Sequence, residues 1–441
     1  QAYYCEDPFL NQLGVNPVFN LLTSTLDDNR KENRTLHLMS EEDALSKVQK
    51  YLHRQGIDRL SPIARKVERE GTPNRRNVVL VFMESMSANL MGTFGSDKKL
   101  TPYLDSLYQQ SLSFSHFYSS GIHTNHGIYS TLYSFPAIMK RNAMKGSVIP
   151  VYSGLPTVLQ ENGYCNLFFM THESQYDNMN AFLRTNGFDE IYAQENYPSE
   201  KVVNSFGVQD DFMYQYALPI LNERAGTGNP FFSVLLSISN HPPYVIPPYF
   251  HPHSDVLEEQ IVEYADWSIR QFMQAAEKQP WFDNTIFVFL GDHGKMVGTP
   301  ECEMPQSYNH IPLMIYGKDI KPGVYDGFGG QVDVSPTLLG LLNISYLQNN
   351  FGVNLLEEER PCMFFTADNL IGARDSVNMF IYSPDSQQEF KYKLEEGKLH
   401  AATGTDEEAF RNLKDYCFSM LQSTESLVKE HKTLDKVSVK K

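Results

Sequence analysis

Residues 77–85 read Asn-Val-Val-Leu-Val-Phe-Met-Glu-Ser, an uninterrupted apolar run followed directly by a carboxylate. A short continuous run of this kind is typical of a strand buried on both faces of a parallel sheet. Similar runs occupy residues 164–170, 231–238 and 285–290, and segments with helical spacing lie between the runs, for example at 103–112 and 262–277. This alternation predicts an α/β fold with a mainly parallel central sheet.

Polar side chains follow each of the four apolar runs. In chain order they are Glu84, His172, His241, and the pair Asp292 and His293. In open α/β sheets the ligand site lies at the carboxyl ends of the strands, so we expect these side chains to converge on one edge. Two carboxylates and an imidazole form a mixed oxygen and nitrogen set that suits Mn²⁺, Mg²⁺ or Zn²⁺. Each residue alone is better explained by a cap or a turn, so the metal site depends on their joint placement.

A second candidate group lies between the first two apolar runs. Residues 117–127 read Phe-Tyr-Ser-Ser-Gly-Ile-His-Thr-Asn-His-Gly and lead into an apolar stretch at 128–132 that predicts a helix. Thr124 or Asn125 would be the N-cap of this helix, where free N–H groups and the helix dipole favour an anion. A hydroxyl at that point is well placed to attack phosphorus, and a bound divalent cation would favour its alkoxide. The alternative is that Thr124 only caps the helix.

Three further side chains are candidates for binding. Arg184 could grip phosphate oxygens with its planar fork, although a lone arginine is often only a solvated surface residue. His241 begins a stiff His-Pro-Pro-Tyr turn that would hold its imidazole in place, and a structural histidine is the alternative. His310, before the apolar residues 311–316, is the weaker candidate.

Composition limits the classes of protein and of partner. A chain of 441 residues exceeds the ~250–300 residues of a single core, which predicts two packed units. The net charge of −16 disfavours binding to nucleic acid, because like charges repel. The chain contains no apolar run of about 18 residues. Its five cysteines show no C-x-x-C spacing, which argues against a zinc ribbon and leaves one isolated disulfide open.

The chain divides into three parts on pattern. Residues 1–73 are polar, with a helix-like stretch at 26–56, and we expect an N-terminal helical linker that packs on the main domain. Residues 74–345 form the main α/β domain. Residues 346–441 predict a smaller C-terminal α/β lobe with strands at 363–366, 377–381 and 389–394, a hairpin turn at 395–398 and a helix from 406 to about 430.

Several separated blocks carry a family resemblance. They are residues 77–85, 101–107, 114–118, 121–124, 239–244, 291–294, 310–313 and 331–339, which include Thr-Pro-Tyr-Leu-Asp, Asn-His-Pro-Pro-Tyr and Gly-Asp-His-Gly. With these blocks in this order the chain resembles the lipoteichoic acid synthase family of phosphoglycerol transferases, in the sulfatase-like branch of the alkaline phosphatase superfamily. The resemblance covers roughly residues 77–344 and implies a three-layer αβα sandwich.

The resemblance also implies roles for individual residues. One divalent ion, Mn²⁺ in the first place and Mg²⁺ or Zn²⁺ as alternatives, would be held by Glu84, Thr124, Asp292 and His293, with Thr124 forming a phosphothreonine intermediate. The substrate phosphate would be contacted by His172, Arg184 and His241. Phe182 stands where the family tends to carry Trp.

The resemblance further implies substrates and a location, and other activities remain as alternatives. The donor would be a phospholipid head group, phosphatidylglycerol-like, and the acceptor a glycolipid or glycan, at the extracytoplasmic face of the bacterial cell membrane. The full-length protein would carry N-terminal transmembrane helices. Alternatives are a phosphoethanolamine transferase, a phosphodiesterase or sulfatase-type hydrolase, and a binding domain that has lost catalysis. Residues 124–128 lack the Pro and Arg of the C/S-x-P-x-R motif of sulfatases, which disfavours sulfate ester hydrolysis.

Overall fold

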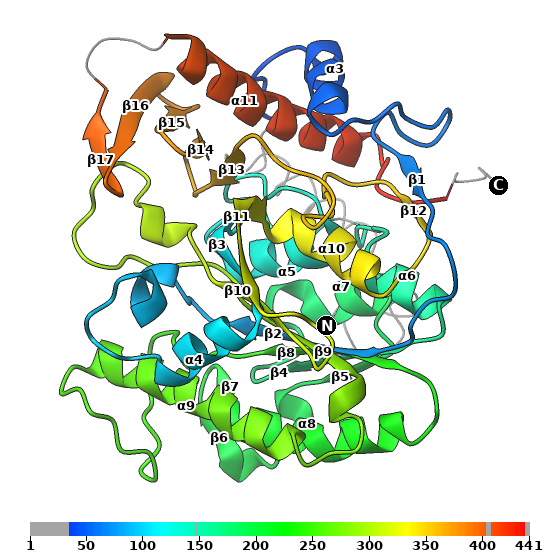
Figure 1. Ribbon diagram of the computed structural model, residues 1–441, viewed down its shortest axis with the longest axis vertical. Helices are drawn as coiled ribbons and strands as arrows, with labels where there is room; N and C mark the ends of the chain where they lie inside the picture. Colours follow the sequence, from blue (N-terminus) through cyan, green and yellow to red (C-terminus); the bar gives the residue numbers. More distant parts are fainter. Residues whose placement is uncertain (1–34, 147, 403–406, 437–441) are drawn as a thin grey trace, which may run out of the picture.

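A mostly parallel sheet of eight strands forms the centre of the protein. The computed structural model describes residues 35–146, 148–402 and 407–436. The strand order is β11-β3-β10-β9-β2-β8-β4-β5, and β10 runs antiparallel to both of its neighbours (Figure 1). The strands are β2 (Asn77–Met83), β3 (Leu112–Tyr118), β4 (Cys165–Met170), β5 (Glu190–Tyr192), β8 (Phe231–Leu236), β9 (Thr285–Gly291), β10 (Leu313–Tyr316) and β11 (Gly323–Gly330).

The four apolar runs are all strands of this sheet, so the predicted α/β class is confirmed. Every residue of β2, β8 and β9 is buried, as expected for strands covered on both faces. β8 ends two residues earlier than predicted. Directly after the strand, the hydroxyl of Ser237 accepts a hydrogen bond from the backbone N–H of Glu84 at 3.0 Å.

Helices cover both faces of the sheet (Figure 1). One face packs against α5 (Thr124–Tyr133), α6 (Leu155–Glu161), α7 (Met179–Thr185) and α10 (Val334–Leu341), and the other against α4 (Pro102–Gln110), α8 (Asp210–Ala225) and α9 (Leu257–Ala276). Alternate residues of β2 divide between the two cores: Val78 and Leu80 on one side, Val79 and Val81 on the other. The arrangement is a three-layer αβα sandwich, and α4 and α9 are the predicted helices.

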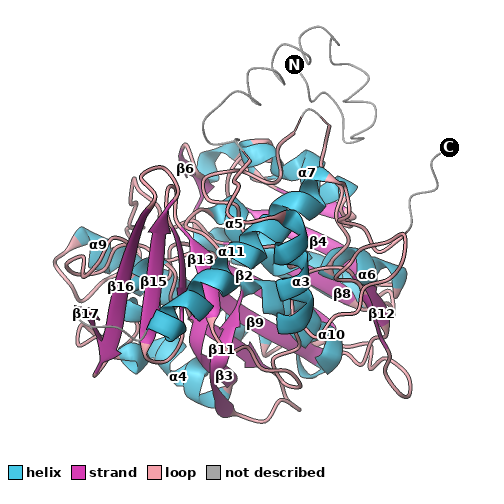
Figure 2. Cartoon of the chain, turned by 90° about the horizontal axis from the view of Figure 1, so that it is seen from above, coloured by secondary structure: helices cyan, strands magenta, loops and turns pink. Residues whose placement is uncertain are grey.

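A separate antiparallel sheet lies beside the central sheet (Figure 2). Its strands are β13 (Met363–Thr366), β14 (Ile371–Arg374), β15 (Asn378–Ser383), β16 (Gln388–Glu395) and β17 (Lys398–Ala401), and α11 (Glu407–Lys429) packs against it. The predicted strands, hairpin and helix are all present. We did not predict β14, because Gly372 and Arg374 interrupt its short apolar pattern.

The described part of the N-terminal segment packs on the C-terminal lobe as well as on the main domain. Residues 1–34 lie outside the described ranges, and α3 (Glu41–Tyr51) contacts the C-terminal helix α11 (Figure 1). Its apolar positions Ala44 and Val48 are buried there, and Lys47 Nζ lies 2.6 Å from Asp415 Oδ2. Further along, β1 (Arg65–Val67) pairs antiparallel with β12 (Tyr346–Gln348), and the N–H of Arg69 donates to Ser345 Oγ of the main domain at 2.8 Å.

The remaining features of the fold are a short hairpin, the hydropathy of the helices and the cysteines. A short hairpin, β6 (Val202–Asn204) and β7 (Gly207–Val208), lies outside both sheets. In the described ranges, no helix combines the length and hydropathy needed to cross a bilayer. Cys165, Cys302, Cys362 and Cys417 are free thiols, and Cys5 lies outside the described residues.

Candidate metal and nucleophile site

Strands β2 and β9 bring three ligand-type side chains together. The strands are parallel neighbours with Met83 opposite Gly291, so the residues that follow them lie side by side. One ligand atom each from Glu84, Asp292 and His293 lies within 4.8 Å of the others. His293 Nε2 is 3.5 Å from Asp292 Oδ2 and 3.7 Å from Glu84 Oε1. The predicted convergence of these three residues at the carboxyl edge is therefore observed.

The hydrogen bonds around this cluster leave its ligand atoms facing one another. Asp292 Oδ1 accepts from the backbone N–H groups of Ser85 and His293, at 2.9 and 2.7 Å. Asp292 Oδ2 is buried and has no hydrogen-bond partner among the described residues. His293 Nδ1–H donates to the carbonyl of Gly294 at 2.7 Å, which leaves the Nε2 lone pair directed at the carboxylates. An orphaned buried oxygen and a free imidazole nitrogen fit a bound cation.

Electrostatics favour a cation at the same point. Burial, reinforced by the charge of Asp292, raises the pKa of Glu84 well above its ordinary value. Two ionised carboxylates buried this close together are unfavourable unless positive charge compensates them. A divalent ion would supply that charge and favour the ionised form of Glu84. The two oxygens and one nitrogen suit Mn²⁺, Mg²⁺ or Zn²⁺ better than a soft thiophilic metal.

Thr124 stands at the edge of this cluster as the first residue of α5. The N-cap is His123, with extended φ and ψ of −129° and 150°, and not Thr124 or Asn125 as we expected. The Thr124 hydroxyl therefore takes no capping role, and Oγ1 lies 3.5 Å from Glu84 Oε2. Gly127 fixes this approach, because a Cβ added there would lie 2.1 Å from the carbonyl oxygen of Asp292.

His172 and His241 have their rings fixed in the same way as His293. Nδ1–H of His172 donates to the carbonyl of Glu173 at 3.0 Å, and Nδ1–H of His241 donates to the carbonyl of Pro242 at 2.6 Å. Burial lowers the pKa of His172, and the nearby His241 contributes in the same direction. Both histidines therefore keep Nε2 for another partner, and their substrate role stays a prediction.

Arg184 is not brought to this edge of the sheet. Its Nε donates to Asn180 Oδ1 at 3.0 Å, and its Nη1 donates to the carbonyl of Asp189 at 3.3 Å. Asp189 directly precedes β5, and its N–H bonds to Asn166 near the start of β4. Helix α7 runs back from the carboxyl end of β4 toward these amino ends, so its last turn carries Arg184 away from the cluster.

Three residues that we did not predict line the site instead. Lys295 Nζ donates to Asn240 Oδ1 at 2.6 Å and lies 5.7 Å from the ring centroid of Tyr244. Burial lowers the pKa of Lys295 to about 8, against the opposing charge of Glu84. Burial raises the pKa of Tyr176 and of Tyr244, and the charge of Glu84 adds to both shifts. The sequence signal was that Lys295 directly follows Asp-His-Gly.

His310 has a structural environment. Its Nε2–H donates to the carbonyl of Ser115 at 2.8 Å, and its ring stacks on Tyr118 at 5.3 Å between centroids. Burial lowers its pKa to about 4, so the ring is neutral at pH 7. This histidine supports the sheet and does not join the cluster.

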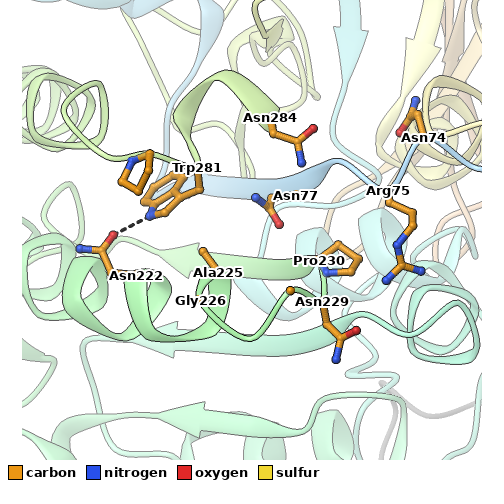
Figure 3. Close-up of a pocket in the computed structure, with 12 residues that line it drawn as sticks. Asn74, Arg75, Asn77, Asn222, Ala225, Gly226, Asn229, Pro230, Trp281 and Asn284 are labelled. Carbon is orange, nitrogen blue, oxygen red and sulfur yellow. Dashed lines mark hydrogen bonds between the residues drawn. The ribbon is translucent and has the colours of Figure 1, made fainter.

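A cavity of about 500 Å³ lies at the opposite end of the sheet (Figure 3). It is lined near the amino ends of β2, β8 and β9 by residues that include Asn77, Asn222 and Trp281. Several of its polar atoms are paired within the protein: Trp281 Nε1 donates to Asn222 Oδ1 at 2.5 Å, and Asn77 Oδ1 accepts from the N–H of Phe231 at 3.0 Å. Its position separates it from the metal-type cluster.

Comparison with known proteins now identifies the family. A match to the family described as Sulfatase covers residues 76–344. The chain belongs to the sulfatase family. Lipoteichoic acid synthase-like YvgJ of Bacillus subtilis (strain 168) is 25% identical over 362 residues, covering 74% of this chain and 56% of YvgJ. Lipoteichoic acid synthase of Staphylococcus aureus (strain NCTC 8325 / PS 47) is 24% identical over 400 residues, covering 80% of this chain and 58% of its own.

Solved structures show the same sulfatase-family fold. An alkaline phosphatase superfamily protein from Vibrio parahaemolyticus has a TM-score of 0.81 at 25% identity, covering 90% of this chain and 97% of its own. The lipoteichoic acid synthase LtaP from Listeria monocytogenes has a TM-score of 0.70 at 21% identity, covering 87% and 98%. The resemblance inferred from the residues is thus confirmed, while the chain spans less than two thirds of the curated relatives' length.

Proposed function

We propose that this sulfatase-family chain transfers a phosphoglycerol-type group from a lipid head group to an acceptor hydroxyl, through a phosphothreonine formed on Thr124. The observation that supports this best is the Thr124 hydroxyl at 3.5 Å from Glu84 Oε2, beside the buried group of Glu84, Asp292 and His293. The names of the lipoteichoic acid synthases that it resembles point to the same class of substrate.

The metal would be held by Glu84, Thr124, Asp292 and His293, with Mn²⁺ as the first choice and Mg²⁺ or Zn²⁺ as alternatives. When bound, such an ion supplies Lewis-acid stabilisation of the charge on the phosphoryl oxygens. The hydrogen bond that the backbone N–H of Ser85 donates to Asp292, and the one that His293 donates to the carbonyl of Gly294, orient these ligands.

The remaining chemical roles are assigned to side chains and backbone groups of the protein. Thr124 Oγ1 gives its proton to solvent and attacks phosphorus, the bond from phosphorus to the diacylglycerol oxygen breaks, and that oxygen takes a proton from solvent. The N–H groups at the start of α5 face the developing negative charge. His172 and His241 keep Nε2 for the phosphate or its leaving oxygen, and Lys295 takes the cationic role that we had assigned to Arg184. An acceptor hydroxyl then attacks phosphorus and releases Thr124.

We base the proposed substrates and location on the names of the relatives. The donor is a phosphatidylglycerol-like lipid, the acceptor is a glycolipid or glycan, and the site works at the extracytoplasmic face of a bacterial membrane. The Thr124 hydroxyl, at the head of a ten-residue helix and 3.5 Å from Glu84 Oε2, is compatible with each of these substrates.

The decisive experiment looks for the covalent adduct. The protein is incubated with Mn²⁺ and phosphatidylglycerol vesicles, and we expect one phosphoglycerol unit on the peptide that carries Thr124, read by mass spectrometry. Thr124→Ala should show no adduct and no turnover while keeping its far-UV circular dichroism and melting temperature. Thr131→Ala, in the same helix, should still form the adduct. Full turnover by Thr124→Ala excludes the covalent route.

The same experiment separates the alternative activities. An adduct from phosphatidylethanolamine alone would make the protein a phosphoethanolamine transferase. Release of glycerol phosphate at full rate in the absence of any acceptor would make it a phosphodiesterase.

A further inference from the structure

A second cavity lies where the antiparallel sheet meets the main domain. It has a volume of about 470 Å³. It is lined by residues 35–38, by residues 138–140 after α5, by Asp368 and Asn369 between β13 and β14, and by Tyr382, Pro384, Asp385 and Gln387 around the β15–β16 turn. Both units of the protein therefore contribute walls. None of the residues that we place at the metal site lines this cavity.

One hydrogen bond connects this cavity to the nucleophile. His123, the N-cap of α5 and the residue before Thr124, lies with Nε2 2.6 Å from Oδ1 of Asp368. The side chains of His123 and Asp368 are 41% and 40% exposed, so the pair is reachable from solvent. The end of β13, just before Asp368, is fixed to the segment before α5, because the N–H and the hydroxyl of Thr366 both donate to the carbonyl of Ser120, at 2.9 and 3.1 Å.

The chemistry of the walls selects a class of ligand. The lining includes the aromatic side chain of Tyr382 and the amide side chains of Asn369 and Gln387. It also includes apolar side chains such as Ile138, and the charged residues Lys140 and Asp385 carry opposite signs. An aromatic face with amide donors and acceptors is suited to hydroxyl-rich molecules, while walls of mixed charge give no general attraction for a polyanion. The volume falls within the range of about 300–1,000 Å³ that is usual for small-molecule sites.

We propose that this cavity binds the acceptor, as a polyol or glycosyl head group, and presents its hydroxyl to the phosphoryl group on Thr124. This inference rests on the proposed function. In the step, a bond forms between the acceptor oxygen and phosphorus, and the bond between Thr124 Oγ1 and phosphorus breaks. The hydroxyl proton of the acceptor leaves to solvent, and Thr124 regains a proton from solvent, so atoms and charge balance.

The test blocks the cavity and measures the two half-reactions separately. Asn369→Trp fills the cavity from an exposed position, and Gln388→Trp, exposed on the adjacent strand and outside the cavity lining, is the matched control. Adduct formation is measured with lipid alone, and clearance of the isolated adduct is measured with glycerol or octyl glucoside. We expect Asn369→Trp to form the adduct at the wild-type rate and to lose at least about tenfold in acceptor-dependent clearance.

A binding measurement keeps the inference independent of turnover. In a Thr124→Ala background, saturation-transfer NMR should detect octyl glucoside on the parent protein and on Gln388→Trp, and the signal should vanish in Asn369→Trp. Retained binding, or wild-type clearance by Asn369→Trp, overturns the acceptor cavity. If wild-type protein forms no adduct but octyl glucoside binding is lost in Asn369→Trp, the proposed function fails while the polyol site stands.

Discussion

Glu84 and Asp292 are two buried carboxylates that share one imidazole neighbour, and this proximity makes the metal-free site unfavourable. Burial and the charge of Asp292 both act against the ionised form of Glu84. Any ion that binds the folded state and compensates these charges must therefore stabilise the fold by mass action.

Removing one of the two carboxylate charges should reduce the stabilisation of the fold by the ion. With Mn²⁺ at about 100 times its Kd, the wild-type protein should gain about 2.7 kcal/mol in its free energy of unfolding. Glu84→Gln should lose most of that gain, because one ligand charge is gone. Differential scanning fluorimetry with and without chelator measures both. Glu173→Gln, which alters an exposed carboxylate, is the control, and an equal Mn²⁺ shift in Glu84→Gln would contradict the site.

Replacing Lys295 and replacing Arg184 should affect the activity to different extents. Lys295 lies between Asn240 and Tyr244 at the cluster, whereas Arg184 bonds near the amino ends of β4 and β5. Lys295→Gln should lower kcat/KM for the lipid donor by about tenfold or more, because a charge-assisted hydrogen bond contributes about 1.5–3 kcal/mol. Arg184→Gln should stay within about threefold of wild type. The reverse order of effects would restore Arg184 to the phosphate site.

Helix α5 is the element that sets the position of the nucleophile. Its first turn passes so close to the Asp-His-Gly turn that only glycine fits at position 127. The sequence pattern indicated the helix and its anion-binding start, but it placed the N-cap one or two residues late, at Thr124 or Asn125, since Thr and Asn are better capping residues than His. The position of Arg184 could not be predicted either, because it depends on the direction of the seven-residue helix α7.

Gly127→Ala tests the close approach. Alanine is the better helix former by about 1 kcal/mol, so the helix itself should not be weakened. The new methyl group would meet the carbonyl of Asp292 and push α5 outward, and we expect turnover to fall by about a hundredfold, as for a displacement of about 1 Å. Steady-state kinetics measures the effect. Gly323→Ala, where an added Cβ would have open space, should remain active, and an active Gly127→Ala would refute this role of the helix.

Across the whole molecule, one core joins the main domain to the antiparallel sheet. Arg360 connects them: its Nη2 lies 2.6 Å from Asp333 Oδ1, next to α10, and its Nη1 donates to the hydroxyl of Tyr416 on α11 at 2.9 Å. Both ionic side chains are nearly inaccessible to solvent. Breaking such a pair leaves an unpaired buried charge.

Arg360→Ala should lower the free energy of unfolding by about 3–5 kcal/mol, measured by urea denaturation. Arg69→Ala, which removes an exposed pair with Glu357, should cost no more than about 1 kcal/mol. Because the core is continuous, we expect a single transition for the described units. A small effect of Arg360→Ala, or two transitions in the wild type, would contradict the joint core.

The strands, the layers and the group of Glu84, Asp292 and His293 were predictable, because each depends on local pattern and on the general rule for strand ends. The order of the eight strands and the docking of α3 on α11 were not, because they depend on contacts between segments that lie hundreds of residues apart. The cavity between the two sheets was hidden for the same reason, since its walls come from four separate segments.

The most direct measurement is anomalous diffraction from crystals grown with Mn²⁺. We predict one strong peak bounded by Glu84 Oε, Asp292 Oδ2, His293 Nε2 and Thr124 Oγ1. A crystal saturated with Mn²⁺ that shows no peak among these four side chains would contradict the account at its centre.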